Sequence, residues 1–128
     1  MQRKFVLIIL ILGLTVQNFL KSTTSFLKDC SKVKIEANIL KATCLNNDSS
    51  VQISIDLDQC IANFNGRLLW NDNPYGLFSK NCQSCSLCDS VMTCQCMRAD
   101  LGSSVSASID LKDGVENSSG ELKCKNLS

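Results

Sequence analysis

Nine cysteines and no histidine define the chemistry that is open to this chain of 128 residues. The densest group is Cys82-x2-Cys85-x2-Cys88-x5-Cys94-x-Cys96, and thiolates at such spacing can bind zinc. In an oxidising compartment the same cysteines form disulfides, which is the expected use in a small secreted chain. Without histidine, the usual general base and the Ser-His and Cys-His nucleophiles are excluded. The inventory favours a disulfide framework over a metal site or an active site.

The elements that must position these cysteines are two copies of one unit. The block at residues 54–68 recurs at residues 108–122, with Ser, Ile, Asp, Leu, Asn, Gly and Leu at matching places and an offset of 54. Self-similarity at a fixed period indicates that each copy is one supersecondary unit. We therefore expect tandem repeats at about residues 25–70 and 78–124.

The aromatic and cysteine positions recur with an offset of 52: Phe26, Cys30 and Cys44 in the first copy, Phe78, Cys82 and Cys96 in the second. The repeat itself nominates Cys30–Cys44 and Cys82–Cys96 as disulfides. Each would close a loop of about 15 residues and stabilise the fold by about 3 kcal/mol. The repeated positions also predict that Phe26, Phe78 and Trp70 pack in the core and do not stack on a ligand.

The other five cysteines are less constrained by the repeat. Cys85 and Cys94 are nearly in register with Cys82–Cys96, so we expect a second disulfide across the same pair of strands. Cys60, Cys88 and Cys124 then remain. One pair among them is expected, and one cysteine must be left over, free or intermolecular. On this interpretation no metal or other cofactor is required.

Period-two alternation of apolar and polar residues predicts an all-β fold. Val51, Ile53, Ile55 and Leu57 alternate with polar residues, and the second copy repeats the pattern at residues 105–112. Further strands are expected at residues 26–35 and 38–44, with a turn cluster at 46–50. Asn65-Gly66 predicts a hairpin turn, and Gly120 supplies the same permissive position in the second copy. No window after residue 25 has a convincing helical period.

Asp56 and Asp110 are carboxylates at equivalent positions of the two copies, which could suggest an acid pair. Each ends a strand in its own copy, where a turn or cap role is expected. We therefore predict that the protein is not an enzyme and has no catalytic residues.

The first 24 residues are typical of a signal peptide. A basic start is followed by an apolar run at residues 5–14 that is too short to span a membrane. Cleavage after Thr24 would leave residues 25–128 with ten basic and 12 acidic side chains, a net charge of −2. Without a basic field or a Lys/Arg stripe, no nucleic-acid partner is expected. We expect a secreted, extracellular protein that has no membrane association after cleavage.

The repeat resembles the cyanovirin-N homology family of glycan-binding proteins. The matching pieces are Phe26-x3-Cys30, Cys44, the block from Ile55 to Leu68 and Trp70, with their copies through Leu122. The resemblance implies a cyanovirin-N-like fold in residues 25–128: two pseudo-symmetric, intertwined halves, each a three-stranded antiparallel sheet plus a β-hairpin. One half would combine residues 25–59 with 114–128, and the other would be residues 60–113.

The resemblance also implies function: recognition of high-mannose glycans, chiefly mannose-α1,2-mannose units, in one shallow pocket per half and without catalysis. The pocket of the middle half would involve Asn63, Asn65, Lys80, Asn81, Met97, Arg98 and Asp100. The pocket of the other half would involve Lys28, Asp29, Leu45, Asn46, Asn47, Asn117 and Ser119.

Four departures from the family pattern bear on sugar binding. Ala62 replaces a frequent acidic residue, Lys80-Asn81 replaces an acidic-polar pair, and Leu45 and Met97 are apolar where polar contacts are expected. The linker between the copies, residues 70–78, is also about three residues longer.

Asn47-Asp48-Ser49 and Asn117-Ser118-Ser119 are N-glycosylation sequons within one candidate pocket, so glycans there would block it. The partners implied are mannose-rich glycans or glycoproteins, bound by a monomer or a domain-swapped dimer. The alternative is a cysteine-rich secreted structural or interaction protein on the same fold, with sugar binding lost.

Overall fold

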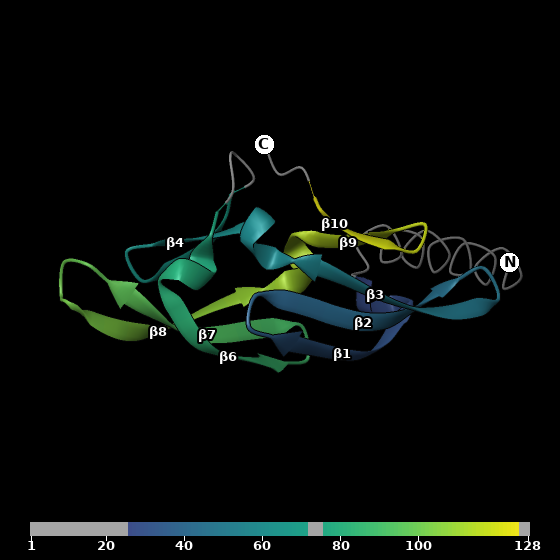
Figure 1. Ribbon diagram of the computed structural model, residues 1–128, viewed down its shortest axis with the longest axis horizontal. Helices are drawn as coiled ribbons and strands as arrows, with labels where there is room; N and C mark the ends of the chain where they lie inside the picture. Colours follow the sequence, from purple (N-terminus) through teal and green to yellow (C-terminus); the bar gives the residue numbers. More distant parts are fainter. Residues whose placement is uncertain (1–25, 72–75, 126–128) are drawn as a thin grey trace, which may run out of the picture.

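The protein consists of two three-stranded sheets and two β-hairpins, seen in a computed structural model that describes residues 26–71 and 76–125 (Figure 1). Every regular element in these ranges is a strand or a three-residue 3-10 helix, which confirms the all-β prediction. No helix of the described ranges is long and apolar enough to cross a membrane. The expected signal peptide, residues 1–24, lies outside the described residues.

The first sheet contains β1 (Cys30–Glu36), β2 (Ile39–Asn46) and β3 (Ser49–Asp56), all antiparallel. A 3-10 helix, η1 (Phe26–Lys28), precedes it, so the prediction of a strand from residue 26 is wrong. The buried Phe26 side chain explains the difference, because it packs into the core before the strand begins. The β2–β3 turn is also tighter than expected, since pairing extends to the end of both strands.

The second sheet repeats the first. It follows η3 (Phe78–Lys80) and contains β6 (Cys82–Cys88), β7 (Val91–Arg98) and β8 (Ser103–Asp110). The register is the same in both sheets, with Cys82 opposite Cys96 as Cys30 is opposite Cys44. Both first strands also carry an irregularity with a residue in the left-handed region, Lys32 (φ 52°) and Ser84 (φ 54°). The repeat in sequence is therefore a repeat in backbone geometry.

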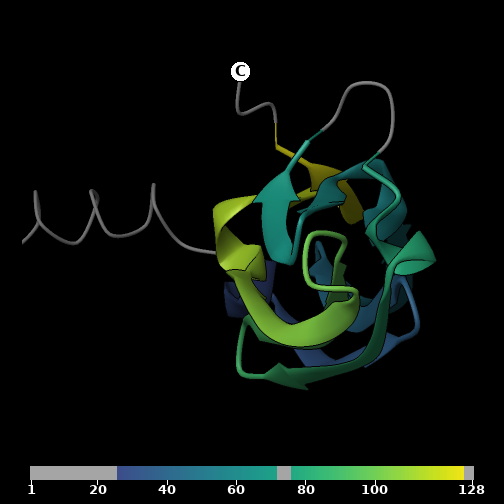
Figure 2. The same cartoon turned by 90° about the vertical axis from the view of Figure 1, so that its left-hand side faces the viewer.

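Each hairpin packs against the sheet of the other copy. The hairpin of β4 (Ile61–Phe64) and β5 (Arg67–Trp70) contacts β7 and β8, while β9 (Val115–Ser118) and β10 (Glu121–Cys124) lie along β3 (Figure 1). Seen along the long axis, the sheets and hairpins are arranged around one common axis (Figure 2). This confirms two intertwined halves, each assembled from parts of both copies.

Two aspartates turn the chain from sheet to hairpin. Asp56 Oδ1 accepts a hydrogen bond from the N–H of Asp58 (2.9 Å) and caps η2 (Leu57–Gln59). Asp110 Oδ1 accepts from the N–H of Lys112 (3.2 Å) and caps η4 (Leu111–Asp113). An N-terminal cap of this kind satisfies a backbone donor that the helix leaves unpaired. The predicted cap role of both carboxylates is confirmed.

The chain passes from one half to the other at two points that the repeat makes equivalent, at Cys60 and at Gly114. At one of them Cys60 forms a disulfide with Cys124. At the other, Gly114 lies under the Trp70 ring so closely that an added Cβ would be 2.4 Å from three ring atoms. Trp70 is thus the end of β5, not part of a linker, and packs against the core. Of these two equivalent points, one is held by a disulfide and the other by packing of the Trp70 ring on Gly114.

Four disulfides join eight of the nine cysteines: Cys30–Cys44, Cys82–Cys96, Cys85–Cys94 and Cys60–Cys124. The first three are the pairings expected from the sequence, and the fourth selects one pair from the three that remained open. Cys88 is the leftover cysteine and is exposed. Four of the five closely spaced cysteines are in disulfides, so the thiolates that a zinc site needs are not free. Phe26 and Phe78 are buried in the core, as predicted.

Candidate functional site

The tip of the β4–β5 hairpin lies on the second sheet. Asn63 Oδ1 accepts a hydrogen bond from the N–H of Gly66 (2.8 Å), which holds the turn closed. Asn65 and Gly66 both have positive φ, 50° and 88°. A Cβ on Gly66 would lie 2.4 Å from Cγ of Arg98, so only glycine lets the turn approach this side chain. The hairpin thereby places two asparagines beside Arg98.

Arg98 and Asp100 form a bidentate ion pair next to this turn. Arg98 Nε donates to Asp100 Oδ1 (3.0 Å) and Nη2 donates to Oδ2 (2.6 Å). The hydrogen bond from Arg98 holds the pKa of the Asp100 carboxyl below its ordinary value. The Asp100 N–H lies 3.5 Å from Asn65 Oδ1 and links the pair to the hairpin. A fork of this kind fixes the guanidinium orientation and leaves its other N–H groups for a ligand.

The remaining predicted residues of the middle half adjoin this group. Lys80, Asn81 and Met97 line an open depression of about 290 Å³. Asn63 Nδ2 donates to the Met97 carbonyl (3.1 Å), and the Met97 N–H donates to the Asn81 carbonyl (2.8 Å). The structure therefore brings all seven predicted residues into one continuous surface: a hairpin side and a depression that meet at the end of β7.

Other residues of the depression were not predicted from the sequence. They are Ser79, Gln83 and Ser104. Ser104 is the cross-strand neighbour of Met97, so the register set by the repeat could have found it. Ser79 is held in place from the other copy, because Asp58 accepts hydrogen bonds from its N–H (2.9 Å) and its hydroxyl. These hydrogen bonds join residues of different copies, so the sequence around either residue does not predict them.

The second candidate pocket, in the other half, shares the turn but differs in its contacts. Asn117 Oδ1 accepts from the N–H of Gly120 (3.0 Å), as Asn63 does for its own glycine. Its Nδ2, however, lies 4.0 Å from the Cys30 sulfur, where Asn63 reaches a strand carbonyl. Asn46 stands where the middle half has Arg98, with Gly120 packed over its side chain. An amide thus replaces the guanidinium.

The other residues predicted for this pocket lie on the surface around it. Lys28, Asp29, Asn47 and Ser119 are exposed, and the Asp29 carbonyl accepts a hydrogen bond from the Leu45 N–H (2.8 Å). Leu45 is 54% exposed and makes this part of the surface apolar. The pocket therefore offers fewer fixed polar groups than the middle half.

Two sheet-and-hairpin copies that exchange hairpins, each with a polar surface at a hairpin tip, define a class of intertwined tandem-repeat β-proteins. The CVNH domain matches residues 26–123, so the chain belongs to the CVNH family. Comparison with curated proteins finds no match to this chain.

Solved structures of the family are similar to this fold. The CVNH protein of T. borchii is 28% identical, with a TM-score of 0.69, over 80% of this chain and all (100%) of its own. The CVNH protein of Gibberella zeae is 25% identical, with a TM-score of 0.65, over 77% of this chain and 95% of its own. Microvirin, solved as a complex with mannobiose, is 27% identical, with a TM-score of 0.60, over 79% of this chain and 98% of its own.

Proposed function

We propose that this protein is a secreted glycan-binding protein that recognises mannose-α1,2-mannose ends of mannose-rich glycans in the middle half, without catalysis. The observation that carries the proposal is the continuous surface on which the polar side chains of Asn63 and Arg98 are held by hydrogen bonds. Sugars offer many hydroxyls, so a site needs polar groups that are already oriented. Support comes also from the family, since microvirin was solved with mannobiose.

The structure favours the middle half over the other half for three reasons. Its arginine is fixed by Asp100, whereas the equivalent position in the other half is Asn46. The Asn117 amide is directed at a sulfur atom, which is a weak acceptor. A sequon also begins at Asn47, in the other half. We therefore assign the proposed sugar site to the hairpin of Asn63 and its neighbours.

Changing Asn63 to Asp should weaken mannobiose binding at least about tenfold, because the side chain would lose the amide donor that the Met97 carbonyl orients and that a sugar hydroxyl would accept from, while the turn keeps its acceptor for Gly66. Arg98→Ala should have an effect at least as large. The measurement is calorimetric titration of the oxidised protein with α1,2-linked mannobiose. Asn117→Asp is the matched control, since it makes the same change in the other hairpin, and it should leave binding unchanged.

Absence of binding in folded, fully oxidised protein would instead favour a structural or interaction role on the same fold. The observation that favours this second candidate is Met97, which is 41% exposed at the centre of the candidate surface. Loss of binding in Asn117→Asp but not in Asn63→Asp would contradict the assignment to the middle half.

We expect N-glycosylation at Asn47 and not at Asn117 when the chain is made in a eukaryotic secretory host. Asn47 lies exposed in the β2–β3 turn. Asn117 is half-buried, with its oxygen bound to Gly120 and its nitrogen against Cys30. Peptide mass spectrometry after enzymatic deglycosylation in heavy-oxygen water would mark the modified asparagine. Ser49→Ala should abolish the mark, and a glycan on Asn117 with Asn47 bare would contradict the prediction.

A further inference from the structure

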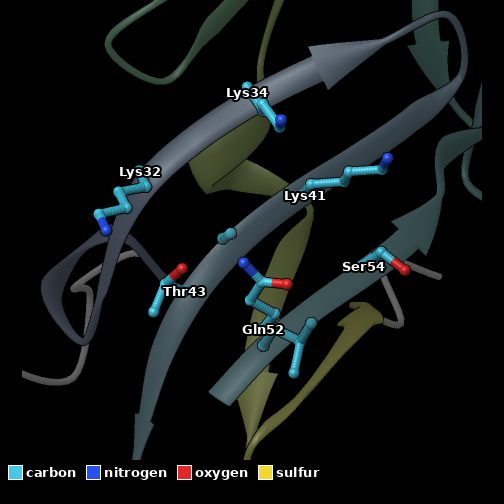
Figure 3. Close-up of a pocket in the computed structure, with 8 residues that line it drawn as sticks. Lys32, Lys34, Lys41, Thr43, Gln52 and Ser54 are labelled. Carbon is cyan, nitrogen blue, oxygen red and sulfur yellow. The ribbon is translucent and has the colours of Figure 1, made fainter. Parts of the chain in front are cut away.

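A groove crosses the exposed face of the first sheet. Its volume is about 460 Å³. The polar side chains that line it come from all three strands (Figure 3): Lys32 and Lys34 from β1, Lys41 and Thr43 from β2, Gln52 and Ser54 from β3. None of these residues belongs to the surface proposed above for mannose.

The groove concentrates positive charge in a chain that is close to neutral. Lys34 and Lys41 are direct cross-strand neighbours, an arrangement that is unfavourable for like charges. Glu36 is bound to both, at 3.1 Å from Lys34 Nζ and 2.7 Å from Lys41 Nζ. Among the ion pairs of the described residues, Lys32 takes part in none. Three ammonium groups against one carboxylate leave an excess of two positive charges.

The fold itself does not need these lysines. In the second sheet, which has the same register and the same irregular first strand, Ser84, Ser86 and Thr93 occupy the equivalent positions. Cys88 stands where the first sheet has Glu36. The basic groove is therefore a property of one copy, on a backbone that the other copy forms with neutral side chains at these positions.

The neutral part of the lining indicates what kind of anion fits. Thr43, Gln52 and Ser54 supply hydroxyl and amide groups that can donate to and accept from sugar hydroxyls. The lining contains no aromatic side chain on which a nucleobase could stack. Ammonium groups beside hydroxyl and amide groups match a saccharide that carries acidic substituents. We propose that this groove binds anionic saccharides, through sulfate or carboxylate groups held by the three lysines.

The experiment compares three tetrasaccharides on the full chain with its four disulfides formed: sulfated maltotetraose, tetragalacturonate and uncharged maltotetraose. Titration calorimetry at low salt should show binding of one or both acidic probes and none of the uncharged one. Binding should weaken as salt is raised, because exposed charges are screened beyond about 10 Å at 0.1 M. Preference for the sulfated probe or the uronate identifies the acidic group.

The test variant gives the first sheet the side chains of the second: Lys32→Ser, Lys34→Ser and Lys41→Thr. It should weaken binding about tenfold, which corresponds to the summed free energy expected of three exposed ion pairs. The charge-matched control removes three basic groups elsewhere, Arg67→Ser, Lys112→Ser and Lys125→Ser, and should bind as the unchanged protein does.

Glu36→Gln provides a test in the opposite direction. Removing the internal carboxylate frees Lys34 and Lys41 for the ligand, so affinity for the acidic probe should rise by about two- to threefold. This gain cannot come from unfolding. Equal binding of uncharged maltotetraose, equal loss in the charge-matched control, or equally tight binding of a short single-stranded DNA would overturn the proposal. Mannobiose binding is measured separately, so this proposal can fail while the mannose site stands, and the reverse.

Discussion

Replacing Cys60 and Cys124 together with alanine is expected to lower the free energy of unfolding by about 4 kcal/mol. This disulfide has a sequence separation of 64, against 9 to 14 for the other three, and so constrains the unfolded chain most. It is also the covalent bond between the two copies at one crossing point. Denaturant unfolding followed by fluorescence of the single tryptophan, which lies at the other crossing, would measure the loss.

Two matched variants test the reason for this effect. Removing Cys85–Cys94 in the same way should cost about 2 to 3 kcal/mol, because its loop is much shorter. Cys88→Ala removes an unpaired cysteine and should leave the midpoint nearly unchanged. A loss for Cys85–Cys94 as large as that for Cys60–Cys124 would contradict the argument from loop length.

Phe78→Ala is expected to lower the free energy of unfolding by about 3 to 5 kcal/mol, the usual cost of deleting a buried aromatic ring. The Phe78 side chain is 1% exposed and belongs to the single core cluster of the described residues. It begins η3, which ends with Lys80 and is followed by Asn81, both of the proposed sugar site. Urea unfolding would give the change in stability, and mannobiose titration at low temperature the change in binding.

The matched control for this substitution is Phe64→Ala. Phe64 is 69% exposed on the β4–β5 hairpin, so the same deletion should change stability by less than about 0.5 kcal/mol. A similar loss in both variants would mean that the exposed ring is buried in solution, by a partner or a second copy. It would contradict the distinction between core and surface drawn here.

The internal repeat made most of the fold predictable. Equal spacing of Cys30–Cys44 and Cys82–Cys96 sets the register of both sheets, because each disulfide joins directly opposite residues of neighbouring strands. Period-two alternation placed β3 and β8, and the turn at Asn65-Gly66 placed the first hairpin. The beginning of β1 was wrong because a buried phenylalanine ring imposes a 3-10 turn that alternation does not detect.

The partner of Cys60 could not be predicted because the repeat is broken at that point. The position equivalent to Cys60 is Gly114, and the position equivalent to Cys124 is Trp70. The disulfide joins one copy to the other, so no spacing within a copy signals it. The contact appears only once the hairpins have been exchanged between sheets.

The candidate sugar site was assembled from the resemblance and its residues do lie together, although nothing in the sequence shows how they are held. The Asn63 bond to the Met97 carbonyl and the Arg98–Asp100 fork are long-range or conformational features. The basic groove was missed for another reason. Net charge averages over the chain, while strand pairing gathers Lys34 and Lys41 side by side on one face.

The Cys60–Cys124 bond also determines the covalent structure of a dimer in which two chains exchange copies. In a domain-swapped dimer, Cys60 of one chain would meet Cys124 of the other, and the same oxidation would then join two polypeptides. Monomer and dimer would have identical halves but different covalent structures. Dilution could not convert one into the other, since that requires thiol–disulfide exchange. The oligomeric state would therefore depend on the protein concentration at which the disulfide first formed, not on the concentration at the time of measurement.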